Sequence, residues 1–174
     1  NSGATFANDS GIGTVDWLTP ENAGASDNSY ATTSGSGVTT SHYLKATNFS
    51  FSIPGGATVG GIQVEWERKR STGTSVVDGA IRIVKGGTIG STDKSAGGAW
   101  PASDTYASYG SSSDLWGETW LASDINSSGF GAALAATMTS DQASVDHVRI
   151  TVTYTTAGSQ SISGTVYSDE GITN

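Results

Sequence analysis

The sequence predicts an all-β protein: a two-sheet antiparallel sandwich, jelly-roll-like, with an extra strand at the C-terminus. Three observations support this fold class. First, 24 of the 174 residues are glycine and only 14% are charged, and few segments have helix-forming composition. Second, Val, Ile, Thr, Tyr and Trp recur in short runs that are separated by clusters of Gly, Ser, Asn and Asp. Third, there are about eight such runs, which is the number of strands in a jelly roll.

The first predicted elements lie before residue 60. Residues 1–40 are polar and rich in glycine, and we expect one or two short strands there, with Trp17 anchoring long loops. The run from His42 to Ile53 predicts a strand, because apolar residues alternate along it and a Pro-Gly-Gly turn follows. The alternating apolar residues are Phe49, Phe51 and Ile53.

The segment Gly61–Arg70 predicts the strongest strand of the chain. Apolar and polar residues alternate along it, so Ile62, Val64 and Trp66 are expected to face the core. Its charged residues are interpreted as a solvated surface group made of Arg68, Lys69 and Arg70 with Glu65 and Glu67.

The middle of the chain is predicted to be less regular. Val76–Val84 predicts another strand, with Ile81 and Ile83 facing inward. A long irregular stretch follows over residues 86–128. Within it we expect a short strand at Ile89 and a helical turn over Ala122–Asn126.

Two strands are predicted to complete the sandwich. Residues 129–138 have a period of two, although their alanine content leaves a helix as the alternative. Val145–Thr155 reads as the closing strand. Its inward residues are expected to be Val148, Ile150, Val152 and Tyr154. The predicted organisation is therefore one domain over residues 1–156, with a linker and a C-terminal strand over residues 157–174.

Composition and charge argue against several functional classes. The net charge is −8 and the isoelectric point is about 4.4. Binding to nucleic acids or to anionic membranes requires a basic face, so both functions are disfavoured. No apolar run approaches the roughly 18 residues that a membrane helix needs. Cysteine is absent, which rules out disulfides, thiolate metal sites and a cysteine nucleophile. No cofactor is expected, and the Ser/Thr/Gly-rich composition fits an exported protein at the cell surface.

The segment Phe49–Lys69 (FSFSIPGGATVGGIQVEWERK) resembles the core of a β-sandwich domain found in secreted bacterial and archaeal surface proteins and in phage-encoded proteins. Later motifs follow the same order, and the resemblance covers about residues 15–155. These motifs are Asp114-Leu-Trp-Gly, Trp120, Asp124-Ile-Asn, Gly129-Phe-Gly, Val145-Asp146 and Ile150–Tyr154. The resemblance implies a non-enzymatic role and brings no catalytic motif. Separately, Ser163–Gly171 resembles the opening strand of a repeat domain in bacterial surface proteins.

Catalytic chemistry is poorly supported by the sequence. The two histidines are His42 and His147, and Asp146 lies on the opposite strand face from its neighbour His147, so the two cannot easily form a hydrogen-bonded pair. Glu65 and Glu67 share a strand face with Cα atoms about 6.6 Å apart, which is compatible with a glycosidase pair. A solvated sheet face is the preferred interpretation, and no enzyme is predicted.

Calcium binding is an alternative for two loops that are rich in oxygen ligands. Their residues are Asp114, Glu118, Asp124 and Asn126 in one loop, and Asp9, Asp16 and Asp27 in the other. Neither loop has the spacing of an EF-hand. Asp and Asn also form turns readily, so no metal site is predicted.

Two kinds of glycan contact are considered. Trp100, Trp116 and Trp120 lie in the long irregular stretch and are candidate sugar-stacking residues, although packing of the rings into the sandwich is the preferred interpretation. Asn8 and Asn126 begin Asn-x-Ser sequons and are candidate glycosylation sites for a secreted protein. A third sequon at Asn48 is predicted to lie in a strand and is less suitable.

The C-terminal run Ser161–Tyr167 predicts one more strand after the closing strand. Ile162, Gly164 and Val166 share one face, and Tyr167 lies on the other. A small-apolar alternation with a central glycine is typical of strands that insert into a neighbouring sheet. The alternatives are an edge strand of the same domain, pairing between two such tails, and the start of a further domain.

These observations lead to one functional expectation and two alternatives. We expect a non-catalytic extracellular structural subunit that assembles with further copies of itself into a surface fibre or pilus-like filament through C-terminal strand donation. Head-to-tail donation produces open filaments unless the rotation closes a ring. The alternatives are a carbohydrate-binding or adhesin module, whose partner would be a glycan or a host surface, and a structural protein of a phage virion.

Overall fold

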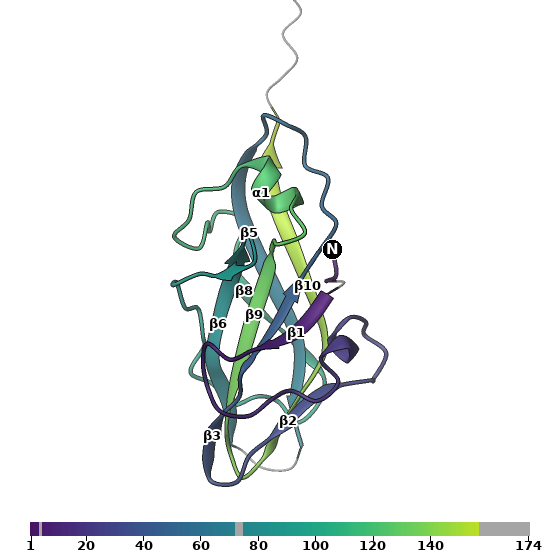
Figure 1. Ribbon diagram of the computed structural model, residues 1–174, viewed down its shortest axis with the longest axis vertical. Helices are drawn as coiled ribbons and strands as arrows, with labels where there is room; N and C mark the ends of the chain where they lie inside the picture. Colours follow the sequence, from purple (N-terminus) through teal and green to yellow (C-terminus); the bar gives the residue numbers. More distant parts are fainter. Residues whose placement is uncertain (4, 72–74, 157–174) are drawn as a thin grey trace, which may run out of the picture.

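The computed structural model describes residues 1–3, 5–71 and 75–156, which form two antiparallel sheets packed face to face (Figure 1). The four-stranded sheet has the order β2-β10-β5-β8, with bounds Ala31–Ser34, Gln142–Thr155, Thr58–Arg70 and Thr105–Gly110. The other sheet has the order β1-β4-β9-β6-β7, with bounds Thr5–Asp9, Tyr43–Thr47, Gly131–Thr139, Val76–Lys85 and Thr88–Ile89. Strand β3 (Val38–Thr40) also pairs with β9, and the short helices are η1 (Pro20–Ala23) and α1 (Ala122–Asn126).

The strand pairing is that of a jelly roll. Strands β2, β4, β5 and β6 pair with β10, β9, β8 and β7, respectively, so the first half of the chain runs antiparallel to the second half in reverse order. The two halves therefore form one long antiparallel pair of chain segments that is folded into two sheets. Strand β1 lies outside this pattern, at the edge beside β4. The predicted all-β, jelly-roll-like sandwich is therefore confirmed.

The core lies between the two sheets and is built from the alternating apolar positions of the strands. Ile62, Val64 and Trp66 of β5 are fully buried, as the sequence predicts. The opposite sheet contributes Ile81 and Ile83 of β6, which are also fully buried. Because side chains alternate between the two faces of a strand, each strand contributes every second residue to this core.

An aromatic cluster fills one part of the core. Phe130 packs edge-on against Phe49, Phe51 and Trp120, with ring centroids 6.4, 5.7 and 5.4 Å away. Edge-to-face contacts of this kind add stabilisation beyond the area that the rings bury. Phe49 and Phe51 thus reach the core although the chain around them is not a strand.

Two glycine positions are needed for the strands to meet as they do. Gly86 and Gly87 have φ values of 56° and 82°, the left-handed conformation that a tight two-residue hairpin turn between β6 and β7 requires. Gly131 lies where β9 passes β4, and a Cβ atom there would overlap the backbone oxygen of Ala46. The sheet therefore closes at this point only because residue 131 has no side chain.

Several predicted elements are confirmed with small changes in their ends. The strongest predicted strand is β5, the next is β6, and the helical turn over Ala122–Asn126 is α1. The strand at Ile89 is β7, and the run at 129–138 is strand β9 rather than helix.

Three predictions about local structure are wrong. The strand predicted to reach Ile53 ends at Thr47, because Asn48 and Ser50 adopt left-handed φ values of 62° and 52°. Strand β8 lies within the stretch that was predicted to be irregular. Tyr154 is 41% exposed rather than inward, because the register of β10 against β5 shifts between Thr153 and Tyr154.

Candidate functional site

The edges of the sandwich are candidate assembly surfaces, and residues 14–18 cover two of them. Thr14 N–H donates to the Thr40 carbonyl (2.9 Å) beside β3. Leu18 and Thr32 exchange two backbone hydrogen bonds (2.7 and 3.1 Å) beside β2. An edge strand presents a row of unpaired backbone groups, and this segment satisfies part of both rows.

A second segment covers the edge of β6. Gly90 N–H donates to the Ile83 carbonyl (2.8 Å), and Lys94 N–H donates to the Ile81 carbonyl (2.9 Å). Farther along, the Trp100 N–H donates to the Val76 carbonyl, also in β6 (2.8 Å). The chain between β7 and β8 therefore runs along β6 and satisfies several of its outward-facing carbonyls.

Strand β8 has a different environment. Its neighbour β5 lies on one side, and no other backbone hydrogen bond to residues 105–110 is present in the part of the chain that the structure describes. The sequence of β8, TYASYG, contains no charged residue and no proline, which are common protections of an exposed edge. Strand β8 is thus an open edge without those protections.

The hydrogen-bond pattern identifies which groups of β8 are free. The N–H and C=O of Ile150 both bond to Asn1 (2.8 and 2.7 Å), on the side of β10 away from β5. Val64 of β5 lies opposite Ile150, and because Ile150 bonds away from β5, the Val64 backbone groups point to the other side, toward β8. On β8 they meet Tyr109, which is opposite Val64. The backbone N–H and C=O of Ser108, the next residue, therefore point away from the sheet.

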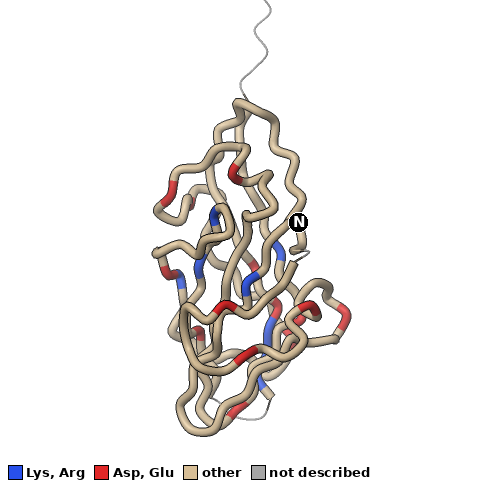
Figure 2. The backbone as a smooth tube through the Cα atoms, viewed as in Figure 1, with Lys and Arg blue, Asp and Glu red and all other residues tan. Residues whose placement is uncertain are grey.

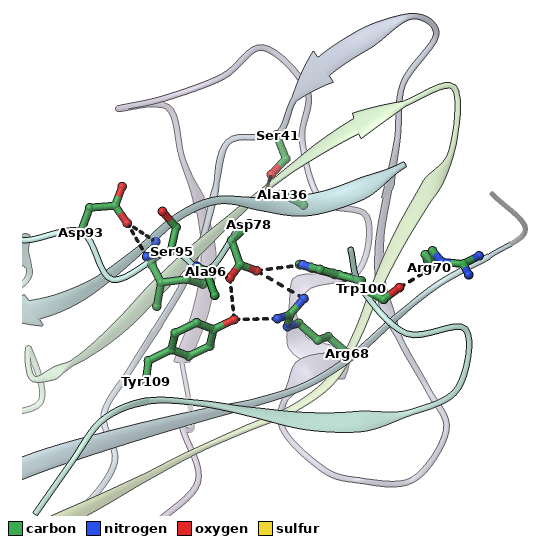
Figure 3. A network of polar contacts seen from close by, with 11 residues as sticks. Ser41, Arg68, Arg70, Asp78, Asp93, Ser95, Ala96, Trp100, Tyr109 and Ala136 are labelled. Atoms are coloured by element: carbon green, nitrogen blue, oxygen red, sulfur yellow. Dashed lines mark hydrogen bonds and ion pairs between the residues drawn. The ribbon is translucent and has the colours of Figure 1, made fainter. Parts of the chain in front are cut away.

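A buried polar network holds β8 in place (Figure 3). The Tyr109 hydroxyl donates to Asp78 Oδ2 (2.8 Å) and accepts from Arg68 Nη2 (2.8 Å). Trp100 Nε1 and the Ala96 N–H also donate to the Asp78 carboxylate (2.8 and 2.9 Å). The network joins β5 and β8 of one sheet to β6 of the other, so β8 is fixed before any partner arrives.

Arg68 is the cation of this network, and the prediction that it belongs to a surface group is wrong. It is 6% exposed, its Nη1 lies 3.3 Å from Asp78 Oδ1, and its guanidinium stacks 4.5 Å above the Trp100 ring. The signal was present in the sequence, because Arg68 is in phase with the buried positions Ile62, Val64 and Trp66. Burial raises the pKa of Tyr109, which keeps its hydroxyl protonated as a donor to Asp78.

The solvent-facing side of the four-stranded sheet carries a chain of polar contacts. His147 Nδ1 contacts the Tyr106 hydroxyl (2.8 Å), and its Nε2 contacts the Ser2 hydroxyl (2.7 Å). Arg149 forms two hydrogen bonds to Glu65 (2.8 and 3.1 Å) and lies over the Tyr106 ring. Burial lowers the pKa of His147, so this imidazole is held in its neutral form.

The three tryptophans considered for sugar stacking are in the core. Trp100 and Trp116 are each 1% exposed, and Trp120 is 9% exposed. Their indole N–H groups donate to Asp78, to the Ile62 carbonyl and to the Leu115 carbonyl. Buried rings offer no open face to a sugar, so this arrangement favours the packing interpretation.

The two candidate glycosylation sites use their side chains as backbone partners. The Asn8 side chain accepts from Trp17 N–H (2.8 Å) and donates to the Trp17 carbonyl (2.9 Å). Asn126 makes the same pair of bonds with Ile53 (2.8 and 2.9 Å). Both asparagines therefore imitate a neighbouring strand, and a glycan on Nδ2 would replace one hydrogen of an amide that is already engaged.

Charged residues of both signs are interspersed along the chain (Figure 2). Several carboxylates of the loops considered for calcium are paired with lysines: Asp9 with Lys45 (2.7 Å) and Asp114 with Lys94 (2.7 Å). Among the described residues, no three His, Asp or Glu side chains are close enough to hold a metal ion. No helix in the described ranges is long and apolar enough to span a membrane.

The candidate strand-donation residues lie outside the described residues. They are Ile162, Gly164, Val166 and Tyr167. Comparison with protein-family models, curated proteins and solved structures finds no match to this chain.

Proposed function

We propose that the chain is a non-catalytic structural subunit of an extracellular filament, in which residues 161–167 of one copy add a strand to β8 of the next copy. The open edge of β8 is the observation that carries this proposal. It is an edge that residues 14–18 and 88–100 leave uncovered, and the Ser108 backbone groups are directed outward from it.

The two segments match in length. Strand β8 has six residues and spans about 20 Å, and the seven residues of 161–167 extend to about 23 Å. Main-chain hydrogen bonds supply affinity in strand addition, and alternating side chains supply register. Because the buried network already fixes β8, the acceptor loses little conformational freedom on pairing.

The composition supports an extracellular setting. The chain is rich in Ser, Thr and Gly, and only 14% of its residues are charged, which fits an exported protein. Donation from one copy to the next is a heterologous contact, which generates a filament when the rotation between copies does not close.

Electron microscopy and sedimentation of the full chain and of a variant lacking residues 157–174 test the proposal. The full chain should form filaments, and the truncated variant should remain monomeric. Ser108→Pro removes the outward N–H of the acceptor and should block assembly, whereas Ser108→Ala keeps that N–H and should assemble normally.

Two results would contradict the proposal. A full chain that stays monomeric at high concentration, with β8 amides protected from hydrogen exchange at every dilution, would mean that the tail completes its own sandwich. Filaments that form equally well from the Ser108→Pro variant would place the contact at another edge.

A further inference from the structure

A cleft of about 370 Å³ lies on the outer face of the β1-β4-β9-β6-β7 sheet, away from β8. It is bounded by β1 and β4 on one side, and by β6 and the β6–β7 hairpin on the other. Side chains at its wall include Asp9, Tyr43, Arg82, Thr88 and Ile89. Its volume falls in the lower part of the range of small-molecule sites, about 300–1,000 Å³.

The apolar part of the cleft follows from the outer face of this sheet. Tyr43 and Val84 belong to a second buried apolar cluster there, together with three alanines of β6 and β9. Ile89 packs against this cluster. Tyr43, which is only 5% exposed, and the partly buried Ile89 form the apolar part of the cleft wall. In contrast, the outer face of the other sheet carries charged residues such as Glu65 and Arg149.

The polar groups of the cleft are held in place before any ligand binds. Asp9 bonds to Lys45 Nζ (2.7 Å) and accepts from the Gly11 N–H (3.1 Å), and Lys45 lowers the pKa of this carboxyl. Arg82 Nη1 donates to the carbonyls of Gly90 and Ser91, both at 3.1 Å. Arg82 Nε is buried and has no hydrogen-bond partner among the described residues.

The charges at the cleft cancel. Asp9 is paired with Lys45, and Arg82 lies 3.8 Å from Asp93. Two cations and two carboxylates leave no net charge to attract an ion. A carboxylate that accepts from hydroxyls, a guanidinium that donates to them, and adjacent apolar surface together suit an uncharged ligand with many hydroxyl groups.

We propose that this cleft binds a neutral saccharide of one or two sugar rings. Glycines at 11, 87 and 90 line the wall and leave room for such a ligand. A Cβ at Gly87 would meet no atom within 4 Å. The proposal goes beyond filament assembly, since the cleft and β8 belong to different sheets and each function can fail without the other.

Saturation-transfer NMR on the full chain tests the proposal, with maltose, lactose, cellobiose and N,N′-diacetylchitobiose as probes. At least one disaccharide should show saturable transfer to its ring protons. Arg82→Met should weaken this binding at least ten-fold. Gly11→Leu should abolish it, because a Cβ there lies 3.2 Å from Asp9 Oδ1 and 3.7 Å from the Tyr43 ring, so a longer side chain would enter the cleft.

The control is Arg149→Met, which removes an arginine from the opposite sheet and should leave binding unchanged. Gly11→Leu keeps every contact of Arg82, so it remains informative if Arg82→Met does not fold. The proposal is overturned if none of the four disaccharides shows saturable transfer, or if Gly11→Leu binds as well as the parent. Binding of N-acetylneuraminic acid in preference to the neutral sugars would overturn the charge argument.

Discussion

Asp78→Ala should be among the most destabilising single substitutions in this chain. The Asp78 side chain is fully buried, and it accepts hydrogen bonds from Trp100, Tyr109 and Ala96 at 2.8 to 2.9 Å. Its removal leaves these donors without their acceptor and leaves Arg68 as an unpaired buried cation. Breaking one partner of a buried ion pair costs about 3–5 kcal/mol. That is a large share of the roughly 5–15 kcal/mol that stabilises a typical domain.

Urea unfolding at neutral pH, followed by tryptophan fluorescence, measures this loss. Glu65→Gln is the matched control, because it breaks an ion pair on the solvent-facing side of the sheet, in which the Arg149 side chain is 44% exposed and the Glu65 side chain 17% exposed. Exposed pairs contribute about 0–1 kcal/mol, so the control should change the free energy of unfolding little. Arg68→Met should cost less than Asp78→Ala, since Asp78 keeps its three hydrogen-bond donors.

A double substitution separates the pair from its surroundings. Arg68→Met combined with Asp78→Ala should cost less than the sum of the two single changes, because the double variant buries no unpaired charge. The reasoning is refuted if Asp78→Ala and Glu65→Gln lower the free energy of unfolding by the same amount within about 1 kcal/mol, the upper worth of an exposed pair.

Two further predictions concern pH and sheet closure. Burial lowers the pKa of His147 below its ordinary value of 6.5, so the folded state binds fewer protons than the unfolded state below that pH. The stability that neutral His147 contributes should be complete above pH 6.5 and should fall as the pH drops. In urea titrations at pH 7.5 and 5.0, the free energy of unfolding should fall more for the parent than for His147→Gln, and equal falls would refute this. Gly131→Ala should impair folding, because its Cβ would overlap the Ala46 backbone oxygen. Gly97→Ala should be tolerated, because a Cβ there meets no atom within 4 Å. Circular dichroism should therefore show a loss of folded structure for the first variant and none for the second.

Much of the fold could be predicted because strand alternation is a local property. The buried faces of β5 and β6 follow from a period of two, and Arg68 fits that period although its charge led to the wrong prediction. The break after Thr47 could not be predicted, since Asn48 and Ser50 lie within an unbroken alternation. Their left-handed conformations accompany contacts with distant segments: Asn126 pairs with the Ile53 backbone, and the nearby phenylalanines pack against Phe130.

The candidate sites depended still more on long-range packing. Strand β8 (TYASYG) has no run of large apolar residues and only one buried residue, so its alternation gives a weak signal. Nothing in its sequence indicates that residues 14–18 and 88–100 cover other edges and leave this one open. The cleft likewise combines Asp9, Tyr43 and Arg82, which come from three different strands.

Composition and two-residue alternation are properties of neighbouring residues, and they were enough to predict the fold class, the inward apolar residues of β5 and β6, and the absence of cysteine chemistry. Only the folded molecule shows that Arg68 meets Asp78, that the Arg68 guanidinium lies over the Trp100 ring, and that the β8 edge is open. Those outcomes depend on which distant strands pair and in what register. For strands far apart in the chain, the partner is fixed by the packing of the whole sandwich, and the alternation within one strand does not identify it.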